Sequence, residues 1–353
     1  MFREDFIKKI NFFLYKKKHL IIYIFIGFFS LIFELLIRKL IFTYYGLESY
    51  LVHFSVFFGI LFAFYFNIKL NFNVPKIYLR RSITYFFLIS ISSYLFQYFV
   101  RSKIDLNNFT FDQSRLIISG CFFLIAYFFH IKFSFKDSRK VGVAIYANGY
   151  EDVKKIYDKI GSYPDFIHVD IVDKTMNEKA LDTNLSKLDL VKAYWSDHKI
   201  ETHIMSKNPI NLINEKILTN SDIIYVHAEI KNREEVVKKI LDYKKIPGIV
   251  LHSINRYENL ENVIKNFKDI LILSIKKPGL SGQKFIDSTY DLIEKLNSLK
   301  NRKNLNVCVD GGVKSNLINT FISEKVVSGS DVLNSENPIK KIMKLQTLSR
   351  YER

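Results

Sequence analysis

The stretch Phe166-Ile167-His168-Val169-Asp170-Ile171-Val172-Asp173 decides the fold of the second part of this chain. Apolar side chains alternate in it with His168 and Asp170, and a period of two is typical of a β-strand with two different faces. His168 and Asp170 therefore share one face, opposite the face that carries Ile167 and Val169. The stretch predicts a buried strand that presents two polar side chains together.

Seven further apolar, β-branched runs lie around this one, and amphipathic segments separate them. We expect strands at residues 141–146, 165–170, 200–204, 223–226, 248–251, 270–275, 305–310 and 325–329, with helices at 150–160, 233–243, 257–267 and 288–299. Eight strands that alternate with helices over about 205 residues predict an α/β protein, a compact (β/α)8 TIM barrel. The alternative is an open doubly wound sheet, but no Gly-rich dinucleotide fingerprint follows any strand.

The first 135 residues have a different composition. They hold 16 Lys and Arg and 6 Asp and Glu, whereas the other 218 residues hold 36 and 29. Four apolar stretches, at residues 20–42, 50–66, 83–100 and 116–131, approach the roughly 20 helical residues that cross a bilayer. The sequence therefore predicts a four-helix transmembrane domain at residues 1–136 and the barrel at residues 137–353. The first stretch is too long for a secretory signal and leads into further spans, so we expect it to be retained.

The basic residues predict the orientation of these spans. Six, four and four Lys or Arg flank the spans on one side of the membrane, and each of the two opposite loops carries two. Positive residues collect on the cytoplasmic side, so we expect an integral protein of the cytoplasmic (inner) membrane with both termini and the barrel in the cytoplasm. The net charge of +17 does not indicate nucleic-acid binding, because the positive residues flank spans or intermix with acidic ones and no RNA-binding motif accompanies them.

Glu34 is the one carboxylate within a predicted span. An ionisable group in a bilayer is costly and is therefore a candidate functional residue. A pair with Arg38, four residues further along the helix, is the alternative explanation.

A first candidate site lies at the carboxyl ends of the barrel strands, where this fold places its chemistry. His168, Asp170, His203 and Asp310 end three different predicted strands. Two imidazoles and two carboxylates suit one divalent transition metal ion such as Zn, Mn, Fe or Co. We therefore predict that these four residues are metal ligands.

A second candidate site binds phosphate. Glycine-rich loops follow the last three predicted strands, and backbone N–H groups in such loops can approach an anion closely. The candidate residues are Gly279, Leu280, Ser281, Gly282, Gly311, Gly312, Gly329 and Ser330. Loops that only turn the chain are the alternative explanation.

Five motifs of the second part occur in the order and spacing found in the ribulose-phosphate 3-epimerase family, which residues 141–345 resemble. The motifs are residues 166–173, 202–205, 277–285, 309–313 and 328–330. The resemblance implies the four metal ligands already named and an epimerisation of a ketose phosphate through an enediolate. Asp170 and Asp310 would exchange a proton on opposite faces of the carbon beside the carbonyl.

The chain departs from this family's pattern at four positions in the pocket wall. Ala144 replaces the Ser of the first strand, Val172 and Ser274 replace methionines, and Lys277 stands where Asn is usual. The proton-transfer residues are retained, so D-ribulose 5-phosphate is the default substrate. Another ketose phosphate, or a sugar destined for an envelope glycan, stays open.

The first part resembles the GtrA-like family of four-span membrane proteins. The resemblance rests on residues 26–28, 64–69 and 129–135. It implies handling of polyprenyl-phosphate-linked sugars at the membrane.

Our leading hypothesis is therefore a membrane-tethered epimerase, an isomerase that serves cell-surface polysaccharide synthesis. The alternative is a transporter or scaffold for the lipid-linked sugar, whose barrel binds a phosphosugar without turnover. An anchored pentose-phosphate enzyme and a homo-oligomeric assembly also stay open.

Overall fold

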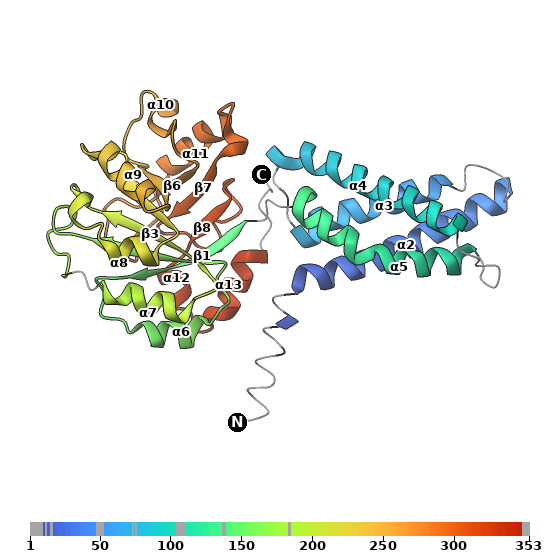
Figure 1. Ribbon diagram of the computed structural model, residues 1–353, viewed down its shortest axis with the longest axis horizontal. Coiled ribbons are helices and arrows are strands. Elements are labelled where there is room, and N and C mark those ends of the chain that lie inside the picture. Colours follow the sequence, from blue (N-terminus) through green and yellow to red (C-terminus); the bar gives the residue numbers. More distant parts are fainter. Residues whose placement is uncertain are drawn as a thin grey trace. The chain divides into compact units, whose positions relative to one another are not determined.

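The computed structural model describes residues 17–46, 53–72, 74, 76–103, 111–135, 139–182 and 185–347, together with Ile10, Phe13 and Leu14. The chain divides into two compact units, Met1–Ser138 and Arg139–Arg353 (Figure 1). The boundary that we expect from the sequence falls within residues 136–138, which lie outside the described residues.

The first unit is helical. Its α-helices are α2 (Lys18–Tyr45), α3 (Phe54–Phe66), α4 (Lys76–Lys103) and α5 (Phe111–Phe129), and π-helical segments η2 (Asn67–Phe72) and η3 (His130–Ser134) extend α3 and α5. Four segments are long and apolar enough to cross a membrane, namely Lys18–Tyr45, Phe54–Phe72, Leu79–Lys103 and Gln113–Ser134. The expectation of four such helices is confirmed, although residues 50–52 of the second expected stretch lie outside the described residues.

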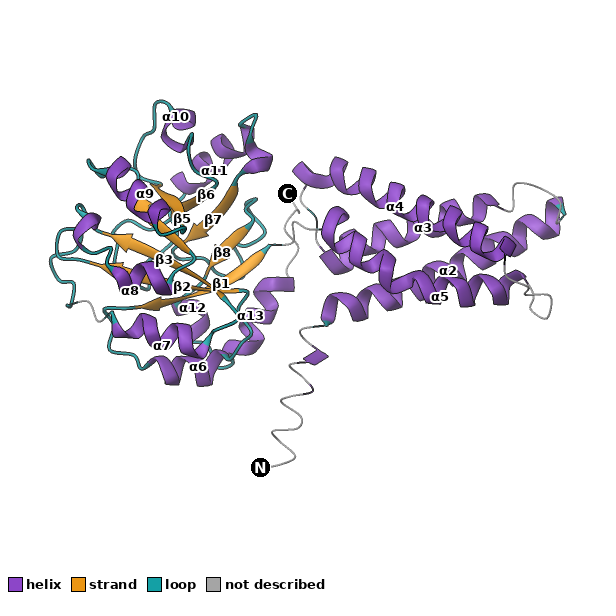
Figure 2. Cartoon of the chain, viewed as in Figure 1, coloured by secondary structure: helices purple, strands orange, loops and turns teal. Residues whose placement is uncertain are grey.

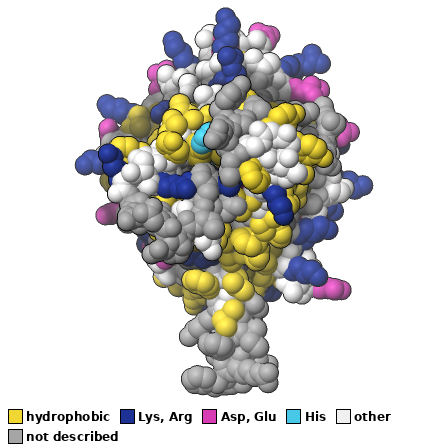
Figure 3. Space-filling model, turned by 90° about the vertical axis from the view of Figure 1, so that its right-hand side faces the viewer, with side chains coloured by type: hydrophobic (Ala, Val, Ile, Leu, Met, Phe, Trp, Pro, Cys, Tyr) yellow, Lys and Arg dark blue, Asp and Glu magenta, His cyan; other side chains and the backbone are white. Residues whose placement is uncertain are grey.

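Large apolar side chains cover the outside of these helices, as Figure 3 shows for one face. Examples that are more than half exposed are Phe25, Phe28, Leu36, Leu88, Leu124 and Phe128. Apolar surface on this scale is unfavourable in water and stable against lipid.

Glu34 has a partner that the sequence analysis did not name. The Arg115 guanidinium on α5 donates from Nε to Glu34 Oε1 at 3.0 Å and from Nη2 to Oε2 at 3.2 Å. Arg115 Nη1 also donates to Gln97 Oε1 on α4. Glu34 is 6% exposed, so the charge pair lies inside the bundle and joins three of its helices.

The second unit is a closed barrel of eight parallel strands, in the order β1 to β8 (Figure 2). The strands are β1 (Lys140–Tyr146), β2 (Phe166–Val172), β3 (Lys199–Met205), β4 (Ile223–His227), β5 (Ile246–His252), β6 (Asp269–Leu273), β7 (Asn306–Asp310) and β8 (Lys325–Val327). The predicted (β/α)8 TIM barrel is therefore confirmed.

Helices surround these strands. They are α6 (Val153–Ile160), α7 (Ser186–Tyr194), α8 (Glu215–Asn220), α9 (Arg233–Asp242), α10 (Leu260–Ile264), α11 (Ser288–Ser298), α12 (Ser330–Leu333) and α13 (Pro338–Thr347), and 3-10 turns lie at η4 (Pro209–Asn211) and η5 (Arg302–Asn304). Alternate strand residues such as Ile167 and Val169 pack outward in the large core beneath the helices. The residues between them point into the barrel, because strand side chains alternate.

Some elements differ in extent from the sequence-based prediction. The helix expected at residues 257–267 spans only Leu260–Ile264. Asn259 caps its N-terminus, and Asn259 Oδ1 accepts a hydrogen bond from Asn262 N. Strand β6 ends at Leu273, two residues early. The Ser274 hydroxyl donates to the carbonyl oxygens of Asp310 and Gly311, which turns the chain toward the neighbouring loop.

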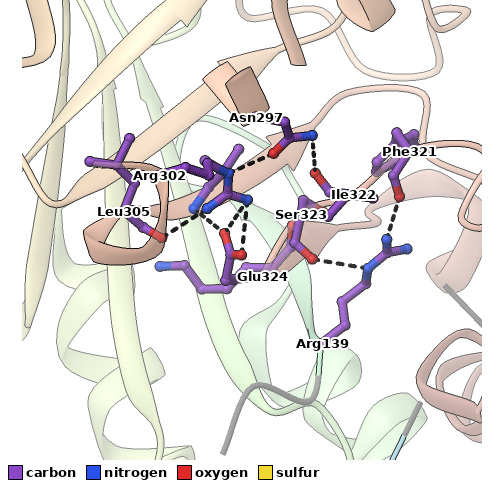
Figure 4. A network of polar contacts seen from close by, with 10 residues as sticks. Arg139, Asn297, Arg302, Leu305, Phe321, Ile322, Ser323 and Glu324 are labelled. Atoms are coloured by element: carbon purple, nitrogen blue, oxygen red, sulfur yellow. Dashed lines mark hydrogen bonds and ion pairs between the residues drawn. The ribbon is translucent and has the colours of Figure 1, made fainter. Parts of the chain in front are cut away.

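Buried polar contacts join the segments that precede β1, β7 and β8 (Figure 4). Arg139 donates to the carbonyl oxygens of Phe321 and Ser323. Arg302 is paired with both oxygens of Glu324, each at 2.9 Å, and Glu324 also accepts from Val307 N at 2.8 Å. Arg302 is 3% exposed, so Glu324 is an anionic partner of a buried guanidinium.

We expect Glu324→Gln to lower the free energy of unfolding of the barrel by about 3 kcal/mol, because it removes the negative charge that is paired with the buried Arg302 guanidinium. Trp195, the single Trp of the chain, is 1% exposed within the barrel, so its fluorescence reports unfolding of this unit in the detergent-solubilised full chain. Asp189→Asn, in an exposed pair with Lys216, should change stability by less than about 1 kcal/mol. Equal denaturation midpoints for Glu324→Gln and the wild type would contradict the prediction.

Candidate metal and phosphate site

Neighbouring strands bring the predicted ligands together. In the parallel register of β2 and β3, Asp170 lies opposite His203, and both strands continue two residues beyond these positions. His168 lies two residues before Asp170 and therefore points to the same side of β2. Asp310 is the last residue of β7. The carboxyl ends of three strands thus supply four side chains to one place in the barrel mouth.

The four side chains form a compact cluster. One donor atom from each of His168, Asp170, His203 and Asp310 lies within 4.8 Å of the donor atoms of the others. Asp170 Oδ1 is 3.4 Å from His168 Nε2 and 3.2 Å from His203 Nδ1. Asp310 Oδ2 is 3.9 Å from His168 Nε2 and 4.0 Å from His203 Nδ1.

The cluster fits a divalent transition metal ion. Donor atoms that bind one ion tetrahedrally at about 2.1 Å lie roughly 3.4 Å apart, close to the distances between the two imidazoles and Asp170. Among the described residues, neither ring nitrogen of His168 has a hydrogen-bond partner, although the side chain is fully buried. A buried imidazole normally satisfies its nitrogens, and a cation would satisfy Nε2, the nitrogen that faces the two carboxyls.

The charges of the cluster also favour a bound cation. Burial alone would raise the pKa of Asp170, but the adjacent imidazoles of His168 and His203 outweigh it and hold that pKa well below its usual range. Burial and the Asp170 charge raise the pKa of Asp310 to about 7. Burial lowers the pKa of His203 to about 4, so this ring is neutral, as a metal ligand must be. Two carboxyls at such short range repel each other when both are ionised, and a cation relieves that repulsion.

A cavity of about 500 Å³ opens beside the cluster. Asp170 and Asp310 line it, whereas His168 and His203 are fully buried behind them. All eight residues predicted to bind phosphate or substrate also line it: Gly279, Leu280, Ser281, Gly282, Gly311, Gly312, Gly329 and Ser330. Residues of both predicted sites therefore line one cavity.

Two glycines allow the loops around the cavity to pack closely. Gly311 and Gly312 have φ of 106° and 64°, a region that favours glycine. A Cβ on Gly312 would lie 2.5 Å from Phe285 N and 2.9 Å from Gln283 O. The loop after β7 can therefore lie against the loop after β6 only with glycine at this position.

The four departures from the family pattern lie in different places. Ala144 lines the cavity. Val172 is buried against Tyr146 and Met205, and Ser274 holds the loop after β7. Lys277 is exposed, and its backbone N–H donates to Gln283 Oε1. Of the four, only Ala144 is a wall residue of the cavity.

The sequence analysis missed three residues at this end of the barrel. Tyr146 lines the cavity, and its hydroxyl donates to Gly279 O at 2.7 Å. His227 ends β4 and contacts His203, and Glu229 follows it. His227 and Glu229 repeat the two-residue spacing of His168 and Asp170 at a strand end, which is the signal that would have revealed them.

We expect the dialysed full chain to bind one divalent transition ion. His203→Ala should weaken the binding of this ion by more than about 100-fold, because loss of a residue that only hydrogen-bonds to a ligand already costs about 10–100-fold. Competition with a chelator measures the affinity. His198→Gln, whose imidazole contacts only Ser162 O among the described contacts, should bind as the wild type does. Unchanged affinity in His203→Ala would contradict the assignment of this ligand.

Comparisons with known proteins found relatives of the barrel. Residues 140–333 match the profile of the ribulose-phosphate 3 epimerase family. Ribulose-phosphate 3-epimerase of Buchnera aphidicola subsp. Baizongia pistaciae is 31% identical over 194 residues, which cover 52% of this chain and 82% of that protein. The protein of that name from Synechocystis sp. is 28% identical over 212 residues, covering 57% and 89%. The structure of 3-hexulose-6-phosphate synthase from Salmonella typhimurium aligns with a TM-score of 0.45 and 14% identity over 59% of this chain and 96% of that one. Since the family match spans more than half of the sequence, the chain belongs, through its barrel, to the ribulose-phosphate 3-epimerase family.

Proposed function

We propose that the barrel epimerises a phosphorylated ketose at the carbon beside its carbonyl group, with one divalent transition ion held by His168, Asp170, His203 and Asp310. The observation that carries this proposal is the cluster of these four side chains beside a cavity that glycine-rich loops also line. Relatives that share this family bear the name of that activity.

The two carboxyls and the two imidazoles have different tasks in this proposal. A bound divalent ion supplies Lewis-acid stabilisation of negative charge on the substrate oxygens. Asp170 and Asp310 reach the cavity surface, so one can remove the proton beside the carbonyl while the other returns a proton to the opposite face. His168 and His203 have no exposed surface and serve to hold the ion and orient Asp170.

The loops after β6, β7 and β8 would hold the phosphate of the substrate. Their glycines leave backbone N–H groups open to an anion, and Ser330 adds a hydroxyl. D-ribulose 5-phosphate is the default substrate. Ala144 lines the cavity without a hydroxyl group, and for this reason the assay includes other ketose phosphates.

The full chain, loaded with metal and incubated with D-ribulose 5-phosphate in deuterated water, should exchange the hydrogen at C3. Asp310→Asn should lower that rate by at least about 1000-fold, because an amide cannot accept the proton. Asp182→Asn, at a side chain that is 95% exposed, serves as the control. NMR follows the loss of the C3 proton signal. No exchange with any ketose phosphate, despite bound metal, would refute the proposal.

We further propose that the first unit is a GtrA-like membrane domain that tethers the barrel to the cytoplasmic side of the inner membrane. The support is the set of four apolar helices and the excess of basic residues at their expected cytoplasmic ends. An epimerase held there would supply a sugar for cell-surface polysaccharide synthesis where the lipid-linked intermediates are made.

A cavity in the helical unit favours a second candidate function, transport or presentation of a polyprenyl-phosphate-linked sugar. This cavity, of about 450 Å³, lies among α2 to α5. Its polar lining residues are Ser30, Glu34, Asn67, Ser90, Ser93, Gln97, Arg115, Ser119 and His130. Polar groups are costly between apolar helices and are typical of a path for a polar molecule. In this candidate function the barrel binds a phosphosugar without turnover.

The two candidate functions make different predictions for the pair Glu34 and Arg115. If the spans handle a lipid-linked sugar, the neutral double variant Glu34→Gln/Arg115→Gln should change the cellular level of lipid-linked glycan several-fold, while Asp170→Asn leaves it normal. Mass spectrometry of extracted lipids measures this level, and membrane abundance of each variant controls for folding. A change only in Asp170→Asn would favour the tethered epimerase and contradict the transporter.

A further inference from the structure

The imidazole of His203 makes contacts through both of its nitrogens. Nδ1 faces the cluster, 3.2 Å from Asp170 Oδ1. Nε2 faces away from it, 3.0 Å from His227 Nε2 on the neighbouring strand β4. The two rings are stacked with centroids 5.2 Å apart, and both side chains are fully buried. The orientation of His203 is therefore determined on two sides by polar contacts.

A carboxylate completes this series of contacts. His227 Nδ1 lies 3.1 Å from Glu229 Oε1. Glu229 is two residues beyond His227, and its side chain is 40% exposed, so its charge remains partly solvated. The contacts run from the cluster through His203 and His227 to an anion near the surface.

The proton positions along this series follow from the chemistry of neutral imidazole, in which one nitrogen donates and the other accepts. A carboxylate only accepts, so His227 Nδ1 must carry the hydrogen that it donates to Glu229. His227 Nε2 is then an acceptor, and His203 Nε2 must donate to it. The lone pair of His203 is then on Nδ1, the nitrogen that faces Asp170 and Asp310. Asp170 also only accepts, and its Oδ1 lies 3.2 Å from Nδ1, so this tautomer is the favourable one when a cation between them takes the lone pair.

We propose that Glu229 and His227 are positioning residues that fix the tautomer and the ring orientation of His203 for metal binding, an inference that rests on the proposed metal site. A ligating histidine commonly donates its other N–H to a carboxylate, and here a second imidazole is inserted between the two. His227 is not itself one of the clustered donors. Its two nitrogens are occupied by His203 and Glu229.

The tautomers can be measured on the full chain loaded with diamagnetic Zn²⁺ and labelled with ¹⁵N-histidine. The nitrogen chemical shifts should show hydrogen on Nε2 of His203 and on Nδ1 of His227. Single His-to-Gln variants assign these signals among the eight histidines of the chain. Hydrogen on Nε2 of His227 in the Zn²⁺-loaded wild type would overturn the proposal, whatever the activity of the protein, because that nitrogen could then not accept from His203.

Metal affinity provides the second measurement, with Co²⁺ as the probe and its visible absorption as a signature of ligand geometry. We expect His227→Phe, which keeps a ring but accepts no hydrogen bond, to weaken Co²⁺ binding about 10–100-fold and to shift the spectrum. Glu229→Ala should weaken it by a similar factor. His227→Gln should recover part of the affinity, because its amide oxygen can accept from His203 Nε2–H. Glu234→Ala, at an exposed carboxylate of α9, is the matched control.

The outcomes separate the two proposals. If the wild type binds no Co²⁺, the proposed metal site itself is wrong. If the wild type binds Co²⁺ and His227→Phe and Glu229→Ala bind it equally well with the same spectrum, the positioning role is wrong. Trp195 fluorescence during denaturation verifies that each variant is folded. Equal affinities of His227→Gln and His227→Phe would also overturn the role of the hydrogen bond.

Discussion

The parallel register of the closed barrel is the constraint on which the candidate site depends. Hydrogen bonding between β2 and β3 sets Asp170 opposite His203, and the two-residue period adds His168 to the same side. The apolar residues between them are held by the core beneath the helices. A slip of one residue would send Asp170 and His168 into that core, so packing and ligand placement enforce each other.

The same constraint explains the buried partners around the site. Strand β4 continues the sheet beyond β3, and its last residue, His227, reaches the side of His203 that the cluster leaves free. At the other end of the barrel, Lys325 donates to Glu201 Oε1 at 2.7 Å and to Asp269 Oδ1 at 3.2 Å. These charges lie inside the barrel at the amino ends of the strands. The fold therefore keeps its charged structural contacts at one end and its candidate chemistry at the other.

Much of this arrangement could be predicted from the sequence, because it depends on local patterns. The alternation in residues 166–173 identifies the strand, and the four proposed ligands stand at comparable places near strand ends. Contacts between distant segments could not be predicted. Glu34 and Arg115 are 81 positions apart, and nothing local to α2 indicates that α5 supplies the counter-charge. His227 was missed although its spacing to Glu229 resembles that of His168 to Asp170, since its role appears only when β3 and β4 are adjacent.

The most direct test of the central claim is the X-ray absorption spectrum of the full chain loaded with one equivalent of Zn²⁺. We predict a first shell of two imidazole nitrogens and oxygen ligands at about 2.0–2.2 Å, with one imidazole lost in His203→Ala. A first shell without imidazole scattering, or one that His203→Ala leaves unchanged, would contradict the claim that the barrel register builds this metal site.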